Sequence, residues 1–159
     1  MSAPTSGPSS LGIRPLGSLV RFAWGNLVAL LLEAALGVGL NLYVSLPSTP
    51  TYVQVFASVP LLTAHIALGF LLVVATGVFV VLSRRAGVPG LTWRAALVLL
   101  FVLVALQEGF SYTFTGTPAF SSGMALAFLL AAIFEGLVVV HLRRAARSPV
   151  PAPTGPTST

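Results

Sequence analysis

Long apolar stretches dominate this chain, and short polar segments separate them. The stretches cover residues 19–46, 59–83, 92–114 and 121–142. Each exceeds the ~20 residues that an α-helix needs to cross about 30 Å of hydrocarbon. Only helices and closed barrels satisfy their backbone hydrogen bonds in lipid, and the sequence lacks the strict alternation of barrel strands. The pattern therefore predicts an all-α protein, a bundle of four transmembrane helices.

The composition excludes other classes of protein. Hydrophobic residues make up 56% of the chain and charged residues 7%, whereas a soluble domain is about a quarter charged. The chain has no cysteine, which excludes disulfides and thiolate chemistry. Residues 1–18 and 146–159 are rich in Pro, Ser and Thr, so we expect two disordered cytoplasmic tails around a membrane domain at 19–145.

The basic residues mark one side of the predicted bundle. All eight are arginines, and they lie at or before the start of the first stretch, around the joint between the second and third, and after the fourth. The other two connections carry no charge. By the positive-inside rule this predicts a multi-pass protein of the cytoplasmic (plasma) membrane with both termini in the cytoplasm. Because the arginines lie at helix ends, the net charge of +5 indicates attraction to lipid headgroups and no nucleic-acid partner.

The two halves of the chain resemble each other. Residues 76–85 align with residues 135–144, and each segment is an apolar run that ends in two arginines. The bundle can therefore be a duplicated two-helix unit, whose halves share one orientation and are related by an axis along the membrane normal. Apolar segments also match by chance, so both explanations stay open.

Every acidic residue lies inside a predicted span. Counting about 1.5 Å per residue from the arginines places Glu33, Gln107 and Glu108 at a depth of roughly 18–21 Å, and Glu135 at roughly 12 Å. A carboxyl at such depth costs ~2.5–3.5 kcal/mol on insertion scales, so it normally faces the bundle interior. Away from the arginines at the span ends, the histidines are the only basic side chains within the spans. We therefore expect largely neutral carboxyls that are hydrogen-bonded rather than ion-paired.

Polar and small residues recur at helical spacing on the first two spans. They are Asn26, Glu33, Gly37 and Asn41 on the first span, and His65, Gly69, Leu72, Thr76 and Ser83 on the second. Since glycines let helices approach closely, the two stripes are expected to face each other. With Gln107, Glu108 and Glu135 they predict a polar cleft that passes protons, holds a quinone headgroup or binds a small solute. Alternatively, these groups only hydrogen-bond across helices, at ~0.6 kcal/mol each.

His65 and Met124 are predicted to lie at one depth. Each stands nineteen residues before an arginine of its own span, at roughly 27–30 Å from the arginine side. A His/Met pair on separate helices of a bundle is a known set of axial ligands, so haem b is a candidate cofactor and its iron the one candidate metal. The alternative is that both side chains only pack. The sequence contains no phosphate loop, no HExxH motif and no aspartate, and we identify no catalytic residue.

Two short motifs carry a resemblance. Asn41-Leu42-Tyr43-Val44, followed by Ala64-His65-Ile66-Ala67-Leu68-Gly69, resembles small four-span membrane proteins of unassigned function from actinobacteria and archaea. The chain is more distantly similar to one half of haem A synthase, whose four-helix halves carry haem-ligating histidines on their second and fourth spans. This resemblance implies a ligand role for His65. Met124 stands where the fourth-span histidine is expected.

Three functions follow from these patterns. The first is a non-enzymatic accessory subunit, associated with a larger membrane complex or with further copies of itself. The second is a b-type haem- or quinone-binding redox protein that uses His65 and handles protons on Glu33 and Glu108. The third is a proton or small-solute carrier that uses the same carboxyls.

Overall fold

The structure, a computed structural model, describes residues 14–43 and 60–147 of the chain. They form four helices: α1 (Arg14–Tyr43), α3 (Pro60–Arg85), α4 (Leu91–Thr115) and α5 (Pro118–Arg147). All four are long and apolar enough to cross a membrane. The described residues contain no strand. The prediction of an all-α bundle of four helices is confirmed.

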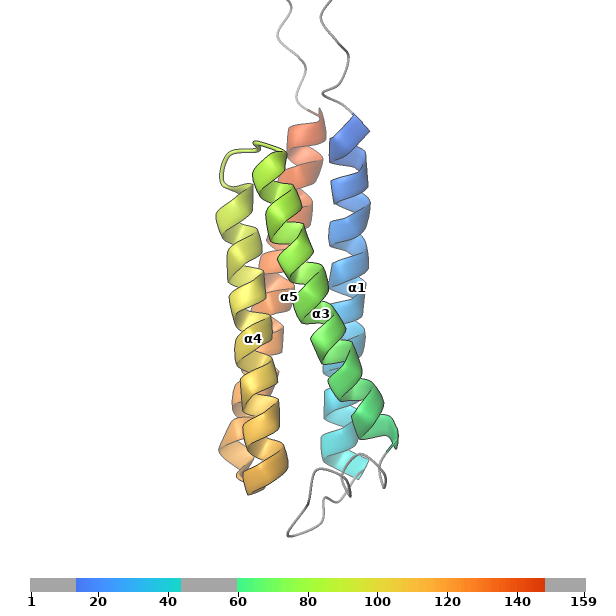
Figure 1. The fold of residues 1–159 in the computed structure, drawn as a ribbon, viewed down its shortest axis with the longest axis vertical. Coiled ribbons are helices and arrows are strands. Elements are labelled where there is room, and N and C mark those ends of the chain that lie inside the picture. The colour runs from blue at the N-terminus through green and yellow to red at the C-terminus, as the bar shows by residue number, and fades with distance from the viewer. Residues whose placement is uncertain (1–13, 44–59, 148–159) are drawn as a thin grey trace, which may run out of the picture.

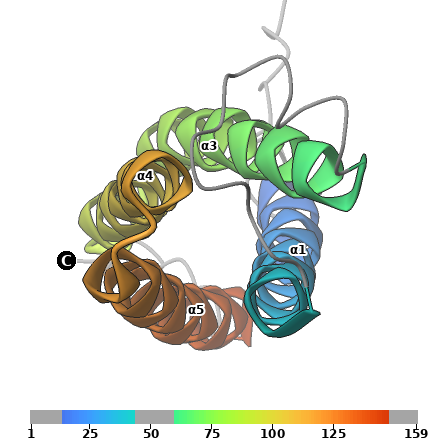
Figure 2. The ribbon, with the colours of Figure 1, turned by 90° about the horizontal axis from the view of Figure 1, so that it is seen from below.

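The helices run side by side along the long axis of the molecule (Figure 1). The start of α1, the end of α5 and the turn between α3 and α4 lie at one end, which we call the arginine end because Arg84, Arg85, Arg143 and Arg144 are found there. The opposite end contains Tyr43 and Tyr112 and is called the tyrosine end. Seen along this axis, α1 neighbours α3 and α5, whereas α1 and α4 are diagonal (Figure 2).

Proline and glycine set the helix boundaries. Pro60 begins α3 and Pro118 begins α5, where a missing N–H costs nothing. Gly90 and Gly116 flank α4 with φ of 72° and 65°, a conformation that side chains with a Cβ rarely adopt.

The structure corrects the predicted tails at both ends of the chain. Helix α1 begins at Arg14, so residues 14–18 are helical rather than disordered. Proline in the first helical turn is favourable, and Pro15 therefore does not delay the start of α1. Helix α5 likewise continues to Arg147 instead of ending at 145. The rest of the predicted tails lies outside the described residues.

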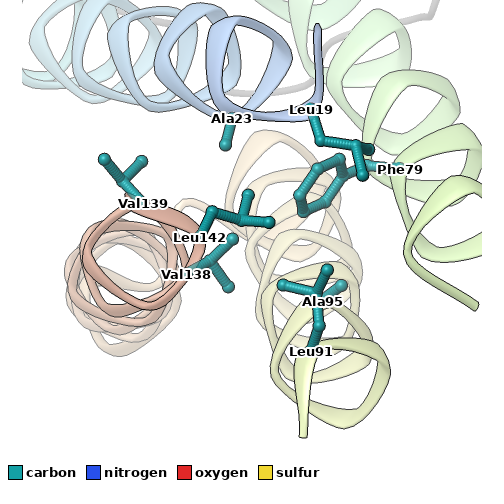
Figure 3. Close-up of a cluster of buried hydrophobic side chains, with 8 residues drawn as sticks. All are labelled: Leu19, Ala23, Phe79, Leu91, Ala95, Val138, Val139 and Leu142. Atoms are coloured by element: carbon teal, nitrogen blue, oxygen red, sulfur yellow. The ribbon is translucent and has the colours of Figure 1, made fainter. Parts of the chain in front are cut away.

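Large apolar side chains fill the interior at the arginine end (Figure 3). The cluster comes from all four helices and contains Leu19, Ala23, Phe79, Leu91, Ala95, Val138, Val139 and Leu142. Phe79 also stacks on Phe22, with ring centroids 5.6 Å apart. His141 Nε2 lies 2.9 Å from the carbonyl oxygen of Pro89 and so links α5 to the turn between α3 and α4.

A second apolar cluster occupies the middle of the bundle. It contains Leu30, Leu72, Val98, Val102, Ala105, Ala127, Phe128 and Ala131. Leu30 and Leu72 are each 1% exposed, and Val98 is completely buried. This layer separates the polar residues of the arginine half from those of the tyrosine half.

Candidate functional site

Glu33 of α1 and His65 of α3 meet in the interior of the tyrosine half. The Nδ1 atom of His65 lies 2.9 Å from Oε1 of Glu33. Both residues are buried. The distance is that of an ion pair, but the contact does not have the geometry of a good hydrogen bond, and Glu33 Oε2 has no hydrogen-bond partner. The two side chains form a close buried contact with unused hydrogen-bonding capacity.

Two glycines make room for this pair. A Cβ atom on Gly37 would lie 3.2 Å from Cε1 of His65, and a Cβ atom on Gly69 would lie 3.3 Å from Oε1 of Glu33. Each polar side chain thus sits over the glycine of the opposite helix, and each glycine follows its own helix's polar residue by four positions. The predicted facing of the two stripes is confirmed for Glu33 and Gly37 on α1 and His65 and Gly69 on α3.

A hydrogen bond crosses the bundle at the tyrosine end. The hydroxyl of Tyr112 on α4 donates to Oδ1 of Asn41 on α1 over 3.0 Å. Asn41 is exposed and Tyr112 is half-buried. Because α1 and α4 are diagonal (Figure 2), this bond spans the interior rather than an interface between neighbours.

Met124 of α5 packs beside His65. Its Sδ atom lies 3.1 Å from the Cβ position of Gly109, and its Cε atom lies 3.8 Å from the Cβ position of Gly37. The ring of His65 contacts this same position on Gly37. The structure therefore brings together the two residues that the sequence places at one depth.

These residues surround a cavity of about 70 Å³ in the tyrosine half. All four helices contribute to it. Its polar lining consists of Glu33, Asn41, His65, Tyr112 and Thr113, and its other lining residues are Gly37, Leu40, Leu62, Ile66, Gly69, Val102, Ala105, Leu106, Gly109, Phe110, Met124 and Phe128. The site is thus an apolar cavity with an imidazole–carboxylate pair in its wall.

Three residues of the predicted cleft lie elsewhere. Gln107 is exposed. Glu108 packs between α4 and α5, where its Oε2 lies 2.8 Å from the Cβ position of Gly123. Glu135 is fully buried in the arginine half and does not line the cavity. Neighbouring residues on a helix point about 100° apart, so a count of depth does not give the direction of a side chain.

The inward face of α4 was missed by the sequence analysis. It consists of Val102, Ala105, Leu106, Gly109 and Thr113, with Phe110 and Tyr112 at its edges. The spacing of these residues, three or four positions apart, could have indicated a common helix face. Most of them are apolar, however, and cannot be distinguished by residue type from the lipid-facing positions around them.

The packing leaves no room for haem. A cavity of about 150 Å³ holds a benzene ring, and this cavity has about 70 Å³. His65 and Met124 both pack against Gly37, where a Cβ atom would lie 3.2 Å from Cε1 of His65 and 3.8 Å from Cε of Met124. Within the described ranges, no three His, Cys, Asp or Glu side chains are grouped as metal ligands. His65 and Met124 are neighbours here, but the site does not fit haem as it is packed.

Comparisons of the chain with protein-family models, with curated proteins and with solved structures give no match. The resemblance to small four-span proteins and to haem A synthase therefore stays a prediction, and the function has to be argued from the geometry of the site.

Proposed function

We propose that this protein binds a small lipophilic molecule of the quinone class, with the polar head of the ligand at Glu33 and His65. The observation that carries this proposal is the apolar cavity with a buried imidazole–carboxylate pair in its wall. Ligand pockets typically combine apolar walls with a few placed polar groups. A quinone has the matching chemistry, because its apolar ring carries two carbonyl oxygens.

The His65–Glu33 pair suits both redox forms of such a ligand. When the pair as a whole is neutral, Nε2 of His65 carries a proton and donates a hydrogen bond to a quinone carbonyl. When the pair has lost one proton, Nδ1–H faces Glu33 and the bare Nε2 accepts a hydrogen bond from a quinol hydroxyl. Glu33 thus sets the tautomer of the ring, in the way that a carboxylate orients a histidine in other sites.

The size of the cavity requires one side chain to move. Its 70 Å³ is about half of the ~150 Å³ that holds a benzene ring. Met124 is the suitable gate, because an unbranched thioether side chain changes rotamer easily. Helices α3 and α4 also diverge toward the tyrosine end (Figure 1).

The orientation in the membrane is part of the proposal. Arginines at one end of all four helices favour placing that end in the cytoplasm, so the cavity belongs to the outer half of the cytoplasmic membrane. Because the chain has no cysteine, single-cysteine labelling tests this directly. In intact cells an impermeant maleimide should modify Thr117→Cys, between α4 and α5, and spare Val88→Cys, between α3 and α4. The reverse pattern would overturn the orientation.

Binding is tested by calorimetric titration of a short-chain quinone into the protein in lipid nanodiscs. His65→Ala should weaken binding by about 1.5–3 kcal/mol, the range for hydrogen bonds to charged groups, or roughly ten- to a hundred-fold. His141→Ala is the matched control, since the second histidine lies at the arginine end. No saturable binding by the wild type, or equal losses in both variants, would reject the proposal.

The other functions stay predictions. An accessory subunit requires a partner complex or a second copy, and a single chain carries no information on either. A proton or small-solute carrier would use the same Glu33–His65 pair, and proton flux in proteoliposomes that Glu33→Gln leaves unchanged would count against it.

A further inference from the structure

A second polar pair lies in the arginine half of the bundle. Glu135 of α5 is completely buried, and Asn26 of the neighbouring helix α1 is 5% exposed. The amide of Asn26 lies within reach of the Glu135 carboxyl. As the two groups are oriented, however, both carboxyl oxygens and the Nδ2 atom of Asn26 lack a hydrogen bond of good geometry. Three buried polar atoms of this pair therefore lack a hydrogen-bond partner.

Buried apolar side chains lie above and below this pair on α1 and α5, and Asn26 also lines a shallow apolar pocket between α1 and α3. One helical turn toward the tyrosine end lie Leu30 of α1 and Ala131 of α5, and one turn toward the arginine end lie Ala23 and Val138. Each of these four is at most 1% exposed. The pair therefore has no connection to the cavity at Glu33 and His65 through the described packing.

Among the described residues of α1, α3, α4 and α5, no cation lies beside Glu135. On α1 the nearest titratable groups are Arg21, which is exposed, and Glu33, which is paired with His65. On α5 the nearest is His141, which is bonded to the Pro89 carbonyl.

The other two helices add no countercharge. On α4 the titratable groups nearest to this level are Arg94 at the arginine end and Glu108 in the tyrosine half, and α3 has none between His65 and Arg84. A buried carboxylate without a counterion is costly, whereas a neutral carboxylic acid is tolerated.

A neutral acid and an amide can form two hydrogen bonds with each other. The acid O–H donates to the amide oxygen, and the amide N–H donates to the acid carbonyl. The nitrogen and oxygen of an Asn side chain are assigned from such networks, so the amide of Asn26 can present both groups. An ionised Glu135 would accept only the N–H and would repel the amide oxygen. All the unpartnered atoms of this pair are therefore explained if Glu135 holds a proton.

We propose that Glu135 and Asn26 form a buried proton-binding site that exchanges its proton with water. Release breaks the Glu135 O–H bond and passes the proton to water, and uptake reverses this step. This site is independent of the proposed quinone site.

Infrared spectroscopy of the protein in nanodiscs at neutral pH tests the site. The chain has only three acidic residues, all glutamate, so ¹³C-glutamate labelling identifies the carboxyl bands in the unaltered protein. We expect a protonated-carboxyl C=O band that is lost in Glu135→Gln and kept in Glu33→Gln and Glu108→Gln. Asn26→Leu should shift that band to higher frequency. A labelled wild type without this band, a band that Glu135→Gln leaves in place, or a band that Asn26→Leu does not shift would overturn the proposal.

Proton exchange at Glu135 is monitored as the shift of this C=O band to lower frequency after the protein is transferred to D₂O. Thr113→Val, in the cavity of the tyrosine half, should leave the half-time of this downshift unchanged. A band that never shifts would refute exchange. Slowing by Thr113→Val would refute the independence of the two sites. Since Glu135→Gln retains the size and amide bonding of the acid, quinone binding by this variant should equal that of the wild type.

Discussion

The two halves of the bundle differ in the side chains that occupy the interior between the four helices. In the arginine half, Leu19, Phe79 and Leu142 project into the interior and fill it (Figure 3). In the tyrosine half, Gly37, Gly69 and Gly109 stand at interior positions, and polar or flexible side chains occupy the space they leave. A binding cavity in this fold therefore arises where glycine replaces large apolar residues on the facing sides of the helices.

The comparison extends to the buried carboxyls. Glu33 pairs with a histidine at the edge of a cavity, where a ligand can reach the pair. Glu135 is completely buried and faces an amide between apolar neighbours on α1 and α5. The same residue type is thus placed for ligand contact in one half and for proton retention in the other.

The largest effect is expected from creating a cavity in the arginine half. Leu142→Ala removes a fully buried side chain of the arginine-end cluster and should lower the free energy of unfolding by about 2–5 kcal/mol. Unfolding in mixed detergent micelles measures this loss. Leu137→Ala on the same helix is the control, because Leu137 is 51% exposed. Quinone binding should be unchanged in both variants, and a loss in Leu142→Ala alone would show that the two halves are coupled.

Filling the cavity of the tyrosine half with a larger side chain should have the next largest effect. Gly37→Leu places a large side chain against His65 and Met124. The clash should weaken quinone binding by about 1–3 kcal/mol, the usual cost of overpacking. Gly39→Leu is a matched control, since a Cβ on Gly39 meets nothing within 4 Å. Calorimetric titration of both variants measures the difference, and equal affinities would contradict the location of the site.

A smaller change in the same cavity should have a smaller effect. Gly109→Ala puts a methyl group 3.1 Å from Sδ of Met124, and this flexible side chain can move only by narrowing the cavity. We expect quinone affinity to fall by about 0.5–1 kcal/mol, or roughly two- to five-fold. Gly136→Ala, which meets nothing within 4 Å, should bind like the wild type. An increase in affinity on Gly109→Ala would mean that Met124 does not limit access.

The smallest effect is expected at the hydrogen bond across the tyrosine end. Tyr112→Phe removes the donor to Asn41 and should cost about 0.6 kcal/mol, or roughly three-fold in quinone affinity. Asn41→Ala should have a similar effect, and the double variant should be no worse than either single one. Additive losses would show that the two side chains act separately.

The sequence was sufficient for the features that depend on length and depth. Apolar run length predicted four helices, and the intervals between Glu33 and Gly37 and between His65 and Gly69 predicted the facing stripes of α1 and α3. Equal distance from the arginines also predicted that His65 and Met124 lie at one level. These features can be predicted from the sequence because each residue of an α-helix adds a fixed rise along the helix axis.

The direction of side chains on α4 could not be predicted in the same way. Gln107 and Glu108 have the depth expected of a cleft, but Leu106 and Gly109 take the inward face instead. An apolar helix in lipid lacks the polar outer face that reveals rotation in a soluble helix. The pairing of Glu33 with His65 rather than with another hydrogen-bonding group likewise depends on how closely Gly37 and Gly69 bring α1 and α3 together.

The central claim is tested most directly by photo-crosslinking with a quinone that carries a photoreactive ring substituent, in nanodiscs, followed by peptide mapping. We predict adducts on cavity residues such as His65, Phe110 and Met124 that excess unlabelled quinone removes. Adducts spread over lipid-facing residues such as Leu71 and Leu129, and insensitive to competition, would contradict the account.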